Sequence, residues 1–125
     1  MKEIFYAEIR PVPKPRLPNT MKFGKLAKRF WDYKKQLQLE AKIQGFIPAH
    51  ALDMTFYMPL PKKKGLRKPG DPHKQTPDID NLVKGALDSL FEDDSVVYEV
   101  RAKKVWNTFG GIEIRNLTGG NVGSD

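Results

Sequence analysis

The sequence of 125 residues contains no cysteine, which excludes disulfide bonds, thiolate metal sites and a cysteine nucleophile. It also lacks any apolar run near the ~20 residues that a membrane span requires, so we expect no membrane partner. Charged residues interrupt the apolar positions of MKEIFYAEIR at the N-terminus, unlike the pattern of a secretory signal. These absences favour a protein of the cytoplasm.

Acidic residues are the minority charge. Lys and Arg number 22 against 15 Asp and Glu, which gives a net charge of +7. Such an excess in a chain long enough for one compact domain favours a polyanionic partner, and nucleic acid is the first candidate.

Hydrophobic periodicity predicts four strands, at 3–10, 49–58, 95–106 and 110–115. It predicts two helices, at 25–43 and about 79–91. Proline-rich segments at 11–18 and 59–75 indicate loops, the second one basic and mobile. This order predicts a single α/β domain of the α+β type, with a four-stranded mixed sheet and two main helices. We expect the domain to span 1–117 and a flexible, glycine-rich tail to span 118–125.

The carboxylates of this basic chain gather in TPDIDNLVKGALDSLFEDDS, residues 76–95. Asp78 stands at the start of the second helix. Helical spacing places Asp80 and Lys84 side by side on the flank of its apolar face, away from the solvent-facing side. Asp93 and Asp94 follow the helix and lead into the third strand.

Three carboxylates held together repel one another unless a cation neutralises them. Oxygen ligands without His or Cys favour Mg²⁺ or Mn²⁺, which can activate water for attack on a phosphate, and Lys84 is placed to contact that phosphate. The helix is roughly 18 Å long. A carboxylate near the third strand therefore reaches Asp78 and Asp80 only if the chain folds back or a second subunit supplies it.

Simpler interpretations exist for each acid. Asp78 can cap the helix, Asp80 and Lys84 can form an i,i+4 pair, and Asp93 and Asp94 can be turn residues. In that case the chain is a basic nucleic-acid-binding protein without catalysis. A third alternative is a metal-dependent nuclease or phosphatase that acts on flaps, single strands or other branched DNA.

Basic residues surround the acidic stretch, and phosphate contacts dominate affinity for DNA. We expect the DNA backbone to meet two sets of them, Lys14 and Arg16 in the first proline-rich segment and Lys62, Lys63, Lys64, Arg67, Lys68 and Lys74 in the second. The aromatic residues of the first helix, Phe30, Trp31 and Tyr33, are expected to pack rather than stack on bases. His73 is expected on a loop or at the surface and not as a ligand.

The same stretch resembles the RusA family of Holliday-junction resolvases. That family carries an Asp-x-Asp-Asn-Leu-x-Lys run, a helix ending in Asp-x-Leu, and then Asp-Asp before a Val-rich strand. The matching residues are Asp78, Asp80, Asn81, Leu82, Lys84, Asp88, Leu90, Asp93, Asp94, Ser95 and Val96. The segment PVPKPR at 11–16 is similar to the one that follows the first strand in many members.

The resemblance implies a Mg²⁺-dependent crossover junction endodeoxyribonuclease, with Mn²⁺ as a substitute, that acts as a homodimer on four-way DNA junctions. It implies metal ligation by Asp78, Asp80 and Asp94 and an essential Lys84, with Asn81 and Asp93 in supporting positions. The family's site lies near the subunit interface. A two-fold dimer would supply two symmetric nicks.

Overall fold

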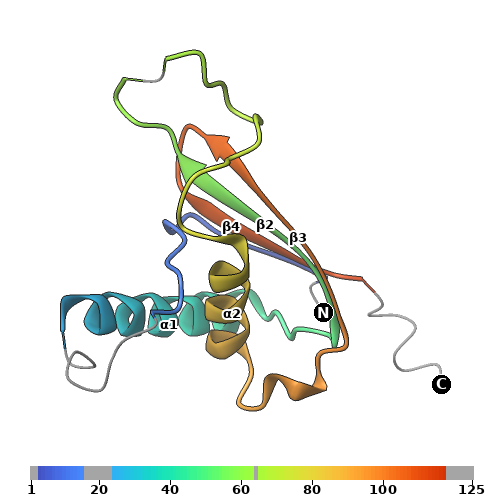
Figure 1. The fold of residues 1–125 in the computed structure, drawn as a ribbon. Coiled ribbons are helices and arrows are strands. Elements are labelled where there is room, and N and C mark those ends of the chain that lie inside the picture. Colours follow the sequence, from blue (N-terminus) through green and yellow to red (C-terminus); the bar gives the residue numbers. More distant parts are fainter. Residues whose placement is uncertain (1–2, 16–23, 64, 118–125) are drawn as a thin grey trace.

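A computed structural model describes residues 3–15, 24–63 and 65–117 of the chain. It contains strands β1 (Ile4–Ala7), β2 (Ala51–Pro59), β3 (Glu99–Asn107) and β4 (Gly111–Asn116), with helices α1 (Lys25–Gln44) and α2 (Ile79–Leu90). The expected fold class is confirmed: one domain with a four-stranded mixed sheet and two helices (Figure 1). The expected tail at 118–125 lies outside the described residues.

The strand order in the sheet is β1-β4-β2-β3. β2 and β3 are parallel, whereas β4 runs antiparallel to both β2 and β1. Strands β1, β2 and β3 therefore share one direction, and their carboxyl ends lie at the same end of the sheet. The loop 60–75 projects beyond that end, while the connection 91–98 lies at the other (Figure 1).

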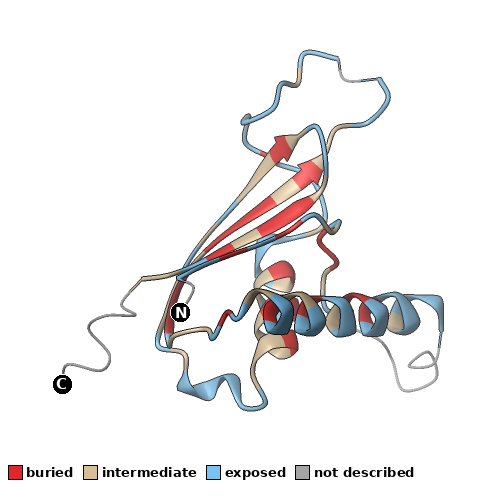
Figure 2. Cartoon of the chain, turned by 180° about the vertical axis from the view of Figure 1, so that it is seen from behind, coloured by how far each residue is buried: buried red, intermediate tan, exposed pale blue. Residues whose placement is uncertain are grey.

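The core lies between the sheet and the two helices. On β2 the alternate residues Leu52, Met54, Phe56 and Met58 are buried, as their spacing predicts. Tyr33 and Leu37 of α1 and Leu82 of α2 join them in one cluster. Buried residues therefore concentrate where strands and helices meet, whereas the loops at both ends of the sheet are mostly exposed (Figure 2). Gly45 follows α1 and ends it with a left-handed φ of 68°. The backbone N–H groups of Gly45 and Phe46 then donate to carbonyl oxygens in the last turn of the helix.

The largest differences from the expected boundaries lie in the first and third strands. The first strand is only 4–7, and the third begins at Glu99 because residues 94–96 form a 3₁₀ turn. The loop after β2 is partly tethered, since residues 70–73 add hydrogen bonds to the edge of β3: His73 N–H donates to Lys104 O at 3.0 Å, and Trp106 N–H donates to Asp71 O at 2.8 Å. In the described residues no helix has the length and apolarity to cross a membrane.

The buried face of α2 is rotated from the predicted one. It centres on Leu82, Gly85, Ala86 and Ser89, which fit closely against neighbouring segments. A Cβ on Gly85 would lie 3.0 Å from Val12 O and 3.1 Å from Phe30 Cε1. Asp80 and Lys84 consequently face solvent, so their prediction on the flank of the buried face was wrong. The apolar residues at 79, 83 and 87 form a stripe that remains partly exposed.

Candidate active site

The start of α2 lies at the carboxyl end of the sheet, where ligands of open α/β sheets usually bind. Lys104, on the helix-covered face of β3, holds this start in place. Its Nζ donates to Gln75 O at 2.7 Å and to Pro77 O at 2.8 Å, in the two residues on either side of Thr76. Burial lowers the pKa of Lys104, and the charge of Asp78 partly restores it. Lys104 thus positions Asp78. Alternation along the third strand places Lys104 in the same inward-facing row as Ala102 and Trp106, and this sequence pattern could have indicated such a role.

Asp78 occupies the N-cap position of α2, but its side chain makes no capping hydrogen bond. Its backbone carbonyl alone starts the helix, accepting from Leu82 N–H at 3.2 Å. Asp80 lies in the first turn, and Lys84 lies one turn further on; all three side chains are exposed. Asp78 therefore occupies the cap position without the hydrogen bond of a side-chain cap. Two carboxylates and an amine face solvent together at the helix start.

Asp94 does not join this group in a single chain. It begins the 3₁₀ turn 94–96, beyond the C-terminal end of α2, whereas Asp80 lies in the first turn at the other end of this 12-residue helix (Figure 1). The helix is roughly 18 Å long. Across the described ranges, no group of three or more His, Cys, Asp or Glu side chains could hold a metal ion. The alternative of a chain that folds back on itself is not realised in this structure.

The two adjacent aspartates have different surroundings. The Oδ1 atom of Asp93 accepts a hydrogen bond from Ser95 N–H at 3.0 Å and caps the 3₁₀ turn. Hydrogen bonds from Ser95 lower the pKa of Asp93. In the described part of the chain, the Asp94 side chain makes no hydrogen bond or ion pair, so its exposed carboxylate remains available as a ligand.

Asn81 and Lys14 fasten the first proline-rich segment to α2. The backbone N–H of Lys14 donates to Asn81 O at 3.0 Å, and Lys14 Nζ pairs with Asp88 at 3.5 Å. Asn81 Oδ1 is buried without a hydrogen-bond partner in the described ranges. Lys14 thus has a structural partner that the sequence analysis did not foresee. Arg16 lies outside the described residues.

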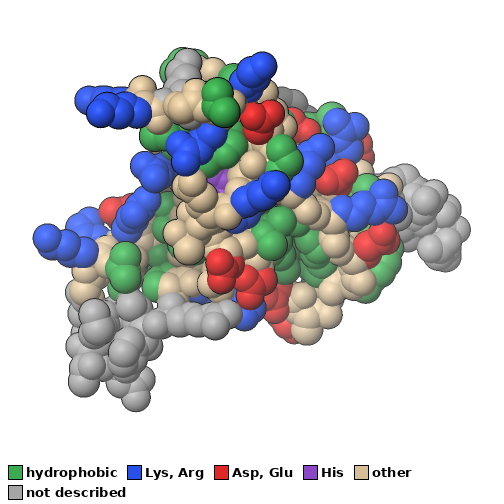
Figure 3. All heavy atoms as spheres, turned by 45° about the horizontal axis from the view of Figure 1, so that its top comes forward, with side chains coloured by type: hydrophobic (Ala, Val, Ile, Leu, Met, Phe, Trp, Pro, Cys, Tyr) green, Lys and Arg blue, Asp and Glu red, His purple; other side chains and the backbone are tan. Residues whose placement is uncertain are grey.

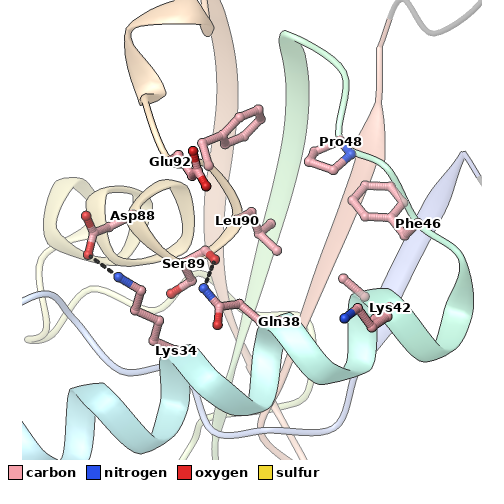
Figure 4. Close-up of a pocket in the computed structure, with 11 residues that line it drawn as sticks. Lys34, Gln38, Lys42, Phe46, Pro48, Asp88, Ser89, Leu90 and Glu92 are labelled. Carbon is pink, nitrogen blue, oxygen red and sulfur yellow. Dashed lines mark hydrogen bonds and ion pairs between the residues drawn. The ribbon is translucent and has the colours of Figure 1, made fainter.

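Asp88 also closes one side of a cleft of about 430 Å³ between α1 and the C-terminal end of α2 (Figure 4). Lys34 Nζ lies 3.7 Å from Asp88, and Gln38 donates to Ser89 O at 3.0 Å. Glu92 lines the same cleft. These contacts hold the end of α2 against α1 and so place the connection that carries Asp94.

The basic loop projects beyond the end of the sheet, and its last residues lead into the start of α2 (Figure 1). Its exposed members are Lys62, Lys63, Lys68 and Lys74, and Lys64 lies outside the described residues. Arg67 is half-buried, with its guanidinium carbon 5.1 Å from the ring centre of Trp106. Lys and Arg side chains are spread over the face of the molecule on which this end of the sheet is seen, with smaller groups of Asp and Glu between them (Figure 3).

His73 lies on a loop, which is one of its two expected placements, but it is buried and does not lie at the surface. Its ring centre lies 4.3 Å from that of Trp106, and only 7% of each residue is exposed. Burial, with the charge of Lys104, lowers the pKa of His73. Its Nδ1 atom is buried and has no hydrogen-bond partner within the described residues. The tethered loop, invisible in the sequence pattern, brings this imidazole to the carboxyl end of the sheet.

Phe30 and Tyr33 of α1 are core residues, as predicted, whereas Trp31 is 53% exposed. The Nζ atom of Lys35 lies 5.0 Å from the centre of the Trp31 ring.

Comparison with known proteins places the chain in a family. Residues 8–115 match the model of the family described as Endodeoxyribonuclease RusA. This match covers every element of the site, from the first proline-rich segment to β4. A search of the curated proteins gives no significant match.

Proposed function

Because the chain belongs to the RusA family of endodeoxyribonucleases, we propose that it resolves four-way DNA junctions by paired, symmetric nicks in a reaction that requires Mg²⁺ or Mn²⁺. The observation that carries this proposal is the group at the start of α2. Asp78 exposes a carboxylate there that makes no capping hydrogen bond, Asp80 exposes a second one, Lys84 lies one turn further on, and the basic loop leads into this group.

The donor set fits a hard divalent cation. Carboxylate oxygens are ligands that Mg²⁺ and Mn²⁺ prefer, and neither histidine lies in the group. Asp78 and Asp80 would hold the ion from one chain. Asp94 is the third proposed ligand, and because it lies at the other end of α2, a second subunit must provide it.

A two-fold dimer in which the α2 helices pack antiparallel would complete the site. The start of one α2 would then lie beside the end of the other, where Asp94 of the partner subunit is found. The surface available for this contact is the apolar stripe of Ile79, Val83 and Leu87, which the rotation of α2 leaves partly exposed. A symmetric contact of this kind gives two identical sites, as two nicks in a symmetric junction require.

The residues of the site have separate roles in the proposed reaction. A bound Mg²⁺ would supply Lewis-acid stabilisation of the phosphate and a water of lowered pKa. Asp78 and Asp80 would hold their carboxylates at a defined place because Lys104 fixes the segment before them. The ammonium group of Lys84 would donate to a non-bridging phosphate oxygen. In this reaction the oxygen of water would form the new bond to phosphorus while the water loses a proton to solvent. The ester P–O bond would break, and the leaving oxygen would take up a proton from solvent.

The test is cleavage of a labelled synthetic four-way junction, with Mg²⁺ and with EDTA, in competition with duplex, flap and single-stranded DNA. We expect two symmetric nicks in the junction with Mg²⁺ and none with EDTA. Tight binding without nicks in any metal would support the non-catalytic alternative. Preferential cutting of flaps or single strands would support the other nuclease alternative.

The exposed lysines of the basic loop should make DNA affinity strongly dependent on salt. Each phosphate contact contributes about 0.9 to the slope of log affinity against log salt concentration on duplex DNA. We expect the double substitution Lys63→Ala and Lys74→Ala to reduce that slope by about 1.8, measured by fluorescence anisotropy with a labelled junction in EDTA. Arg115→Ala is a matched control, since Arg115 lies on β4 and pairs with Glu113 at 3.8 Å. An unchanged slope in the double variant would remove the loop from the DNA interface.

A further inference from the structure

The carboxyl end of the sheet contains a hollow that none of the proposed catalytic residues lines. We call it the strand-end hollow. It has a volume of about 490 Å³ and is lined by Arg10, residues 58–62, His73, residues 75–77 and Trp106. Its volume falls in the range of about 300–1,000 Å³ that is typical of small-molecule sites. The segments that follow β1 and β2, the end of β3 and the tethered loop all contribute to it.

The chemistry of the lining suits a nucleotide. Met58, His73 and Trp106 are buried, whereas the prolines at 59, 61 and 77 present flat apolar rings that a base can lie against. The charged lining residues are Arg10 and Lys62, both cationic and exposed, and none of the acidic residues that the structure describes lines the hollow. Gln75 and Thr76 are exposed polar side chains that can reach the edge of a base. An apolar slot with a cationic rim matches one base and its phosphate.

The buried imidazole is a second observation that indicates a ligand. Buried polar atoms are nearly always hydrogen-bonded, so one without a partner calls for an explanation. His73 lines the hollow, and its Nδ1 atom is such an atom within the described residues. The ring is neutral near pH 7, because burial and the charge of Lys104 lower its pKa. A neutral imidazole carries one donor and one acceptor, which is the pattern needed to recognise a base edge.

The position of the hollow links it to the proposed chemistry. Pro77 lines it, and the next residue is Asp78, a proposed metal ligand. Lys104 ties both Gln75 and Pro77 to β3, so the hollow and the carboxylates are held as one unit. A base in the hollow would therefore belong to a nucleotide next to the phosphate that is cut.

We propose that the strand-end hollow binds one unstacked base of the junction beside the scissile phosphate, and that this contact sets the sequence preference of cleavage. The proposal rests on the proposed nuclease function. Gln75 and Thr76 are the specificity-determining residues. Their side chains can be changed without disturbing the carbonyl groups that Lys104 holds or the buried floor of the hollow.

The first experiment measures nicking of a set of four-way junctions that differ only in the base pairs at the branch point. We expect wild-type protein to prefer certain sequences. The Gln75→Ala and Thr76→Val proteins should still nick junctions. The ratio of nicking rates between preferred and other sequences should fall about tenfold, since one good base contact provides about 1–3 kcal/mol of discrimination. Thr108→Val is the matched control, because Thr108 is exposed at the same end of the sheet but does not line the hollow. Unchanged preference in both variants would overturn the proposal.

The second experiment needs no activity. A junction with 4-thiothymine at each branch-point position in turn is photocrosslinked to the protein in EDTA, and the attached peptide is identified by mass spectrometry. We expect attachment within 58–62 or 73–77. Attachment elsewhere by a protein that nicks junctions would overturn this inference and leave the nuclease function intact. Attachment at the hollow by a protein that never nicks would support base binding and contradict the nuclease function.

Discussion

Asp80→Asn is expected to abolish cleavage of the four-way junction while leaving binding intact. Aspartate and asparagine have nearly the same shape, and the exposed position in the first turn of α2 tolerates either residue. The change removes one proposed ligand of a cation that provides several kcal/mol of transition-state stabilisation. Since each 1.4 kcal/mol corresponds to a factor of ten, we expect the rate to fall by about a thousandfold or more.

The measurement is single-turnover cleavage with Mg²⁺, together with the affinity for the same junction in EDTA. Affinity should stay equal or rise, because the substitution removes a negative charge that faces the DNA. Asp32→Asn is the matched control: it makes the same chemical change at an exposed site on α1, where Asp32 pairs with Lys28 at 3.1 Å. If Asp80→Asn cuts at the wild-type rate, the carboxylates at the start of α2 are not a catalytic metal site.

Two inactive proteins are expected to restore activity to each other when mixed. The proposed site takes Asp78 and Asp80 from one subunit and Asp94 from the other. A dimer of one Asp80→Asn chain and one Asp94→Asn chain then has both changes in one site and none in the second. Every mixed dimer keeps one intact site of its two, so we expect a preparation that contains only mixed dimers to have about half of the wild-type active sites. Each mixed dimer should give single nicks instead of paired ones.

The measurement is cleavage by a mixture prepared by co-expression with two affinity tags and purified on both. The matched control combines Asp78→Asn with Asp80→Asn, which inactivates both sites of every mixed dimer whichever chain holds Asp94. Activity in the first mixture alone would establish a site shared between subunits. If neither mixture cuts, although each substituted protein folds and binds the junction, the proposed antiparallel dimer is wrong and Asp94 acts in another way.

Local pattern was sufficient to predict the order and type of the elements. The strand face of Leu52, Met54, Phe56 and Met58 follows from strict alternation, and Gly45 ends α1 because glycine adopts the left-handed conformation without strain. The boundary errors lie where hydrogen bonds compete with propensity. Asp93 caps a turn at 94–96 that a Val-rich sequence would otherwise extend as strand.

The rotation of α2 could not be read from its periodicity. The residues at 79, 83 and 87 are as apolar as Leu82 and Ala86, so the pattern alone centres the buried face between the two groups. Close packing decided the outcome, because Gly85 lets the backbone of the first proline-rich segment approach within van der Waals distance. That choice turned Asp80 and Lys84 to solvent and left an apolar stripe for a partner.

The sequence by itself determined the fold class, the family and the chemistry of the proposed site, because each depends on residue type and local spacing. Only the tertiary structure decided which groups come together. Sheet order and the tethered loop bring Lys104 to the carbonyl of Pro77 and His73 to Trp106, contacts between residues far apart in the chain. The same structure keeps Asp94 away from Asp80, because a rigid helix of 12 residues holds its two ends apart.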